Sequence, residues 1–191
     1  MNEEKWAGTG PTGFAAFSMV CLTIFLSLNG LVPKENVPVI FALLFAGAVA
    51  QILAGMVELR KGIGTAGNLL LSFGTMFMLS PALTFLLVGL KIASPVPLMG
   101  YINILLGVFM GIYIIPLVRA PLIPFLIGPI GFFVLTTLGM VELGYAAFKP
   151  VSSFLFAVSV IYGLYMMAYG LGEGAHIHIP VGRPLVPMKA K

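Results

Sequence analysis

Hydrophobic positions along this chain form six long runs, and most polar residues lie in the short stretches between them. The runs occupy residues 12–32, 37–58, 65–91, 97–118, 121–142 and 149–171. An α-helix of about 20 apolar residues is long enough to cross the hydrocarbon core of a bilayer. We therefore predict an all-α integral membrane protein with six transmembrane helices. The brief connections predict antiparallel neighbours in one compact bundle.

Composition points to the same class of protein. Hydrophobic residues make up 60% of the 191 residues and charged residues only 8%, whereas a typical soluble domain has about 25% charged residues. A chain with so few charges cannot cover a surface that faces water, so we expect membrane lipid around it. The predicted organisation is an amino-terminal segment (1–11), a transmembrane domain (12–171) and a carboxy-terminal tail (172–191).

The basic residues predict the orientation of the bundle. Lys and Arg accumulate in cytoplasmic loops, and the alternation of six spans places seven basic residues on one side and three on the other. The larger group comprises Lys5, Arg60, Lys61, Arg119, Arg183, Lys189 and Lys191; the smaller comprises Lys34, Lys91 and Lys149. Both termini should therefore be cytoplasmic. Because these charges are scattered rather than clustered, nucleic acid is not an expected partner.

Small and polar residues form stripes on two consecutive spans. Gly47, Gln51, Gly55 and Glu58 share one face of the second segment, since they recur at helical spacing. Asn68, Ser72 and Thr75 repeat this pattern on the third segment. One interpretation is helix-to-helix packing, for which small and polar residues are common in membranes. The other is a path lined by neutral dipoles, with Gln51, Asn68, Ser72 and Thr75 contacting a small permeant.

Two short motifs each occur twice. "GMVEL" ends the second segment at 55–59 and the fifth at 139–143, which places Glu58 and Glu142 on opposite sides of the membrane. Glu58 is a candidate proton-linked group, although an ion pair with Arg60 or Lys61 is equally compatible with its position.

The second repeated motif is "GPTGF" at 10–14, which returns as "GPIGF" at 128–132. Pro11 suits the first turn of a helix, where free N–H groups attract anions. Pro11 and Gly13 are therefore candidate substrate-binding residues. Pro129 lies inside the fifth segment and should kink it.

The sequence contains no motif that is typical of an enzyme active site or of a metal site. The chain has no cluster of metal ligands, nucleophile elbow or phosphate-binding glycine loop, so we predict neither catalysis nor a cofactor. His176 and His178 lie in the tail without an evident third ligand, and no metal site is predicted there. The single Cys21 is interpreted as a small buried residue.

Several stretches together resemble the acetate uptake transporters, also called succinate–acetate permeases. They are "GPTGFAAF" (10–17), "AGAVAQILAGMVELRKG" (46–62), "SFG" (72–74) and the tail glycines of "GE" (172–173) and "GR" (182–183). The resemblance implies a homo-hexamer in which each protomer has its own path for acetate and related short carboxylates. It also implies proton-coupled uptake and a hydrophobic constriction at the positions of Phe17, Phe73 and Ile130.

The function expected from these features is uptake of acetate or a similar short monocarboxylate, with succinate as a further candidate, across the inner cell membrane. Two alternatives stay open at this point. One is a channel for neutral solutes such as urea or a short amide, and the other is a structural membrane subunit without a pore.

Overall fold

The computed structural model describes residues 8–33, 36–92 and 97–186, and within these ranges it contains helices and no strand. Six helical stretches are long and apolar enough to cross a membrane: Gly10–Leu28, Pro38–Arg60, Gly64–Gly89, Leu98–Leu117, Leu122–Glu142 and Ala146–Gly174. The predicted all-α fold with six spanning segments is therefore confirmed. Most of the amino-terminal segment 1–11 lies outside the described residues, as do Lys5, Lys34, Lys189 and Lys191.

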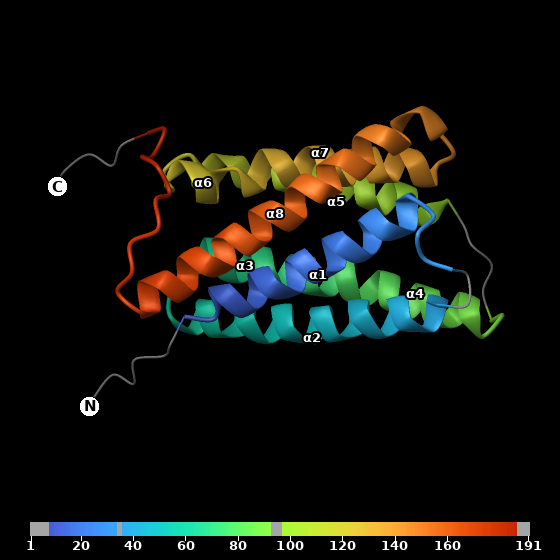
Figure 1. Ribbon diagram of the computed structural model, residues 1–191, viewed down its shortest axis with the longest axis horizontal. Coiled ribbons are helices and arrows are strands. Elements are labelled where there is room, and N and C mark those ends of the chain that lie inside the picture. The colour runs from blue at the N-terminus through green and yellow to red at the C-terminus, as the bar shows by residue number, and fades with distance from the viewer. Residues whose placement is uncertain (1–7, 34–35, 93–96, 187–191) are drawn as a thin grey trace.

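The long helices run side by side along the longest axis of the molecule (Figure 1). The elements are α1 (Gly10–Leu28), α2 (Val37–Arg60), α3 (Gly64–Ser72), the π-helix η2 (Phe73–Leu79), α4 (Ser80–Gly89), α5 (Leu98–Leu117), α6 (Leu122–Phe125), α7 (Ile127–Glu142), the 3-10 helix η3 (Ala146–Phe148) and α8 (Lys149–Gly174).

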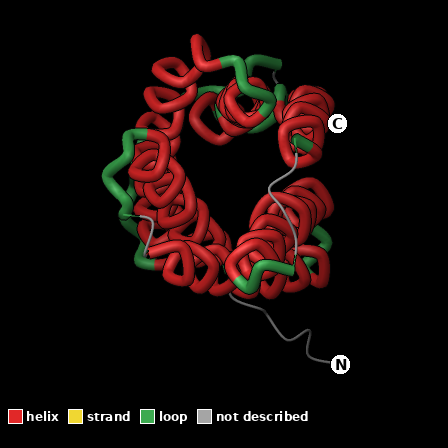
Figure 2. The backbone as a smooth tube through the Cα atoms, turned by 90° about the vertical axis from the view of Figure 1, so that its right-hand side faces the viewer, coloured by secondary structure: helices red, strands yellow, loops and turns green. Residues whose placement is uncertain are grey.

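Seen end-on, the helices are arranged in a ring (Figure 2). Around this ring α2 packs against α1, α1 against α8, α8 against α7, and α7 against α5. The third segment, made of α3, η2 and α4, packs on α2 and meets α5 over only a short stretch. The first and last helices are thus direct neighbours, which places residues from both ends of the chain in the same wall.

Most helix ends are set by local backbone geometry. Gly62 and Gly144 follow α2 and α7 with φ angles of +79° and +96°, a conformation that glycine adopts without steric cost. In the turn that follows, the N–H of Ile63 donates to the Glu58 carbonyl at 2.9 Å, and the N–H of Tyr145 donates to the Met140 carbonyl at 3.0 Å. This pattern satisfies carbonyls that would otherwise be left unpaired at a helix C-terminus.

Two of the spans are interrupted inside the membrane region. In the third, the π-helical stretch precedes Pro81, which lacks an N–H, and the Ser80 N–H donates to the carbonyl of Thr75, five residues earlier. In the fifth, the helix breaks at Leu126 between α6 and α7, three residues before Pro129. The break fits the predicted distortion, because a proline ring disfavours helical geometry in the turn that precedes it.

The carboxy-terminal tail packs back onto the bundle. The Val181 carbonyl accepts from the N–H of Ile123 at 2.9 Å, and the N–H of Val186 donates to the Val118 carbonyl at 3.1 Å. Val118 caps the C-terminus of α5, and Ile123 belongs to the first turn of α6, so the tail pairs groups that the helices themselves leave open. The helix before it, α8, extends to Gly174 rather than ending at residue 171.

Candidate functional site

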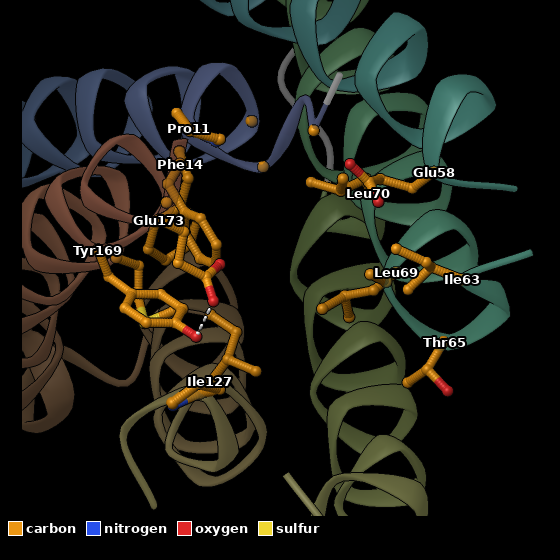
Figure 3. A pocket seen from close by; sticks show the side chains of 18 of the residues that line it. Pro11, Phe14, Glu58, Ile63, Thr65, Leu69, Leu70, Ile127, Tyr169 and Glu173 are labelled. Carbon is orange, nitrogen blue, oxygen red and sulfur yellow. Dashed lines mark hydrogen bonds between the residues drawn. The ribbon is translucent and has the colours of Figure 1, made fainter. Parts of the chain in front are cut away.

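A cavity of about 1000 Å³ opens at the end of the bundle where α1 and α3 begin and α8 ends. We call it the vestibule. Its wall is mostly apolar, and residues of α1, α2, α3, α8 and the region around the α6–α7 break contribute to it. In Figure 3, Pro11, Phe14, Tyr169 and Glu173 lie on one side, while Glu58, Leu69 and Leu70 lie on the other. The hollow therefore sits inside the ring of one protomer.

Phe17 and Phe73, both predicted at a constriction, line this vestibule. They are only 6% and 7% exposed. Phe17 lies seven residues into α1, a depth of about 10 Å at 1.5 Å per residue. Phe73 opens the π-helical stretch, and its ring meets that of Phe77 edge-on with 5.6 Å between centroids. The two phenylalanines thus form part of the deep, apolar end of the vestibule.

Ile130, the third residue predicted at the constriction, does not line the vestibule. It is half-buried and packs against the hydrophobic core. Ile127 lines the vestibule instead. The two residues lie about one turn apart on nearly the same face of α7, so Ile130 continues the line that Ile127 begins, one turn deeper in the bundle.

Gln51 joins α2 to the start of α1. Its Nε2 donates to the carbonyl of Gly13 at 3.1 Å, while its Oε1 is buried without a hydrogen-bond partner. Gln51 is 2% exposed and contributes to the vestibule wall, as do Pro11 and Gly13. Gln51, Pro11 and Gly13, each predicted from the sequence as a candidate substrate-binding residue for a separate reason, therefore lie together in the structure. One of the two amide N–H groups of this glutamine is thus paired with Gly13, and its oxygen is an open hydrogen-bond acceptor.

Glu58 is held on both carboxylate oxygens. The N–H and hydroxyl of Thr9 donate to Oε1 at 2.9 and 3.0 Å, and Lys61 Nζ lies 3.4 Å from Oε2. The Thr9 hydroxyl also lies 3.0 Å from the Ala54 carbonyl. Glu58 therefore ties the entry of α1 to the end of α2. Among the two interpretations of this residue, the contacts match the ion pair with Lys61.

The stripe on the third segment lies outside the vestibule, which corrects its predicted position. Asn68 and Thr75 are exposed and Ser72 is half-buried, and none of the three lines the vestibule. Asn68 donates to the Gly64 carbonyl at 2.8 Å and Thr75 to the Leu71 carbonyl at 2.7 Å. The face turned inward carries Leu69, Leu70 and Phe73 instead. A polar stripe satisfied by its own helix backbone can face outward as readily as inward.

Sequence reasoning missed the part of the wall that α8 supplies. Tyr169 lines the vestibule and donates from its hydroxyl to Glu173 Oε1 at 2.6 Å (Figure 3). The spacing of four residues between these side chains was the available signal. Tyr162 and Tyr165 instead donate to the carbonyls of Pro124 and Pro180, so they attach α6 and the tail to α8.

Comparisons with known proteins bear on the fold. The chain is similar to the solved structure of the bacterial acetate channel SatP, with 22% sequence identity and a TM-score of 0.83. The match covers 93% of this chain and 100% of that chain. No family model and no curated protein matches. Similarity at this identity establishes a shared fold, and the six helices that can cross a membrane make the chain a multi-pass membrane protein.

Proposed function

We propose that this protein is a membrane channel or transporter for acetate and related short monocarboxylates, with a path through each protomer. The observation that carries the proposal is the vestibule, which runs inside the protomer to Phe17 and Phe73, in a fold shared over nearly the whole chain with an acetate channel. A large apolar hollow that opens at one end of the bundle and reaches inward to two phenylalanines is the feature expected of a passage for small solutes.

The lining supports a preference for small acids that are protonated or accompanied by a proton. A carboxylate loses its hydration at an apolar constriction, and this costs several kcal/mol when no partner replaces the water. A carboxylic acid with an ordinary pKa of about 4 is neutral in roughly one molecule per thousand at pH 7. Coupling of uptake to protons follows if the neutral form is the one that passes Phe17 and Phe73. The anchoring contacts of Glu58 favour a structural role over a proton-linked one.

The proposal includes a homo-hexamer in the inner cell membrane with both termini in the cytoplasm. Large apolar side chains remain exposed along one face of α5, which is the surface expected to meet lipid or a neighbouring protomer. They are Tyr101, Leu105, Val108, Ile112 and Ile115. In this orientation the vestibule opens toward the cytoplasm, and Gln51, Pro11 and Gly13 lie where a permeant would pass.

A neutral solute such as urea or a short amide is the second candidate, and Gln51 supports it. Its open Oε1 can accept a hydrogen bond, and a neutral amide or a protonated acid offers a donor that a carboxylate lacks. Lys61, which is the one Lys or Arg among the described residues that line the vestibule, is paired with Glu58.

Purified protein in liposomes separates these functions. We expect labelled acetate to enter, faster when the outside is acidic, and we expect succinate to enter more slowly because it carries a second carboxyl group. Acetate flux that ignores the proton gradient and is blocked by excess urea would favour the neutral-solute channel. Liposomes that admit no solute would favour a structural subunit, while cross-linking in native membranes would test the hexamer.

A further inference from the structure

One of the closest approaches between α1 and α8 occurs directly behind Phe17. Gly163 on α8 is buried there, and its backbone faces α1. A methyl group added at Gly163 would lie 2.2 Å from Ser18 Oγ, 2.9 Å from Phe17 Cδ1 and 3.3 Å from the Phe14 carbonyl oxygen. Each distance is shorter than ordinary van der Waals contact, so only glycine fits without displacing a neighbour.

Phe17 lies between this glycine and the vestibule. One edge of its ring rests against the backbone of α8 at Gly163, and the side chain also contributes to the deep wall of the vestibule. Its exposed fraction is 6%, so the ring is packed on nearly all sides. An atom added at position 163 must therefore displace the Ser18 hydroxyl, push the Phe17 ring toward the vestibule or separate the two helices.

The neighbouring Ser18 is the first group that a methyl group at position 163 would meet, ahead of Phe17. Ser18 Oγ donates to the Phe14 carbonyl at 3.0 Å and lies 3.4 Å from the Val160 carbonyl on α8. Only the second contact joins α1 to α8, and at 3.4 Å it is long for a hydrogen bond, so Ser18→Ala should leave the packing of the two helices largely in place. If Ser18 is first shortened to alanine, the nearest obstacle to a methyl group at position 163 is the ring of Phe17.

We propose that Gly163 is a specificity-determining residue that acts through Phe17. Because glycine has no side chain, the Phe17 ring can pack against α8, and this position of the ring sets the width of the permeation path. This inference rests on the proposed function, since it assumes that solutes pass Phe17. The width of the passage then depends on a residue of α8 that does not itself contact the solute. Larger side chains at position 163 should narrow the passage and exclude longer solutes first.

The test compares permeability for short and long solutes in liposomes by stopped-flow light scattering. The pairs are formate with butyrate, and formamide with butyramide. In a Ser18→Ala background, we expect Gly163→Ala to lower the ratio of long to short solute permeability at least tenfold. Phe17→Ala removes the ring that the new methyl group would displace. The triple variant should therefore have the same permeability ratio as the Phe17→Ala, Ser18→Ala double variant.

Gly107→Ala is the matched control. Its added methyl would lie 2.5 Å from Thr136 Oγ1 and 3.1 Å from the Phe132 carbonyl oxygen, a similar clash on the α5–α7 side, and Gly107 does not line the vestibule. It should leave the solute ratio unchanged, as should Ser18→Ala alone. The inference would be overturned if a folded Ser18→Ala, Gly163→Ala variant had the same ratio of long to short solute permeability as Ser18→Ala alone. An equal drop of this ratio in Gly107→Ala would overturn it as well.

The two solute pairs separate the inference from the proposed function. Unaltered protein that passes the amides but neither acid overturns only the proposed function, and the amide ratio then tests Gly163. Unaltered protein that passes none of the four solutes overturns both.

Discussion

The two copies of "GMVEL" end α2 and α7, and their surroundings differ. In each copy the glycine allows a close approach to a carbonyl of another glycine on a neighbouring helix. A methyl group at Gly55 would lie 2.9 Å from the Gly67 oxygen, and one at Gly139 would lie 2.5 Å from the Gly100 oxygen. The same five letters therefore produce the same kind of helix packing twice.

The carboxylates of the two copies differ in what surrounds them. Glu58 is buried, tied to Thr9 and Lys61, and lines the vestibule. Glu142 is exposed at the other end of the bundle, where it accepts one hydrogen bond from Asn103 Nδ2 at 2.7 Å. It does not line the vestibule. A short motif thus sets local packing, while its role in a site depends on which other segments the fold brings beside it.

The largest effect is expected from substitutions of the glycine that packs against a neighbouring helix in both copies. Gly55→Ala and Gly139→Ala should each lower the free energy of unfolding by up to about 3 kcal/mol, because the new methyl meets backbone atoms that cannot move independently. Thermal unfolding in detergent measures this loss. Gly89→Ala is the control, since a methyl group there would meet nothing within 4 Å. Equal stability in all three variants would show that the glycines are not packing sites.

The next change separates the two carboxylates. Glu58→Ala removes two hydrogen bonds from Thr9 and the contact with Lys61, and it should cost about 2 kcal/mol of unfolding free energy, as expected for bonds to a charged group. Glu142→Ala should cost less, because its side chain is exposed and has one partner. Chemical denaturation in mixed micelles provides the comparison. If Glu58→Gln stays stable but loses the response of acetate flux to a proton gradient, the anchoring role is wrong.

Phe73→Ala tests the role of the deep end of the vestibule. Shortening this side chain should widen the deep end and raise the flux of small acids about tenfold, equivalent to about 1.4 kcal/mol in the barrier. Acetate and butyrate uptake into liposomes measures both rate and selectivity. Leu135→Ala, a buried change on α7 away from the vestibule, controls for loosened packing. Unchanged flux and selectivity would remove Phe73 from the passage.

The smallest effect concerns the tail that packs near the open end. Gly182 has a φ angle of +76°, and a methyl group there would lie 2.9 Å from Leu122 Cβ. Gly182→Ala should cost about 1 kcal/mol through backbone strain and release the tail from α6. Limited proteolysis of the tail should then become faster. Gly174→Ala, which meets nothing within 4 Å, should leave proteolysis at its original rate.

Hydropathy predicted the six spans, and the structure confirms them, because a helix in lipid must satisfy its own backbone and be apolar along its length. The distortion expected at Pro129 is also present, since it follows from the local chemistry of one residue. The polar stripe of Asn68, Ser72 and Thr75 could not be oriented in the same way. Helical spacing tells which residues share a face, and it does not tell whether that face meets a cavity, lipid or another subunit.

The sequence by itself determined what each segment does alone: that six segments are helical and long enough to span the membrane, and that the fifth is distorted near Pro129. Only the tertiary structure decided that α1 lies beside α8, that Tyr169 and Glu173 line the vestibule, and that Gly163 stands behind Phe17. Helix formation in lipid depends on neighbours a few residues away, whereas a cavity depends on the order of helices around the ring. That order is set by side-chain packing between segments far apart in the chain, and periodicity within one segment carries no record of it.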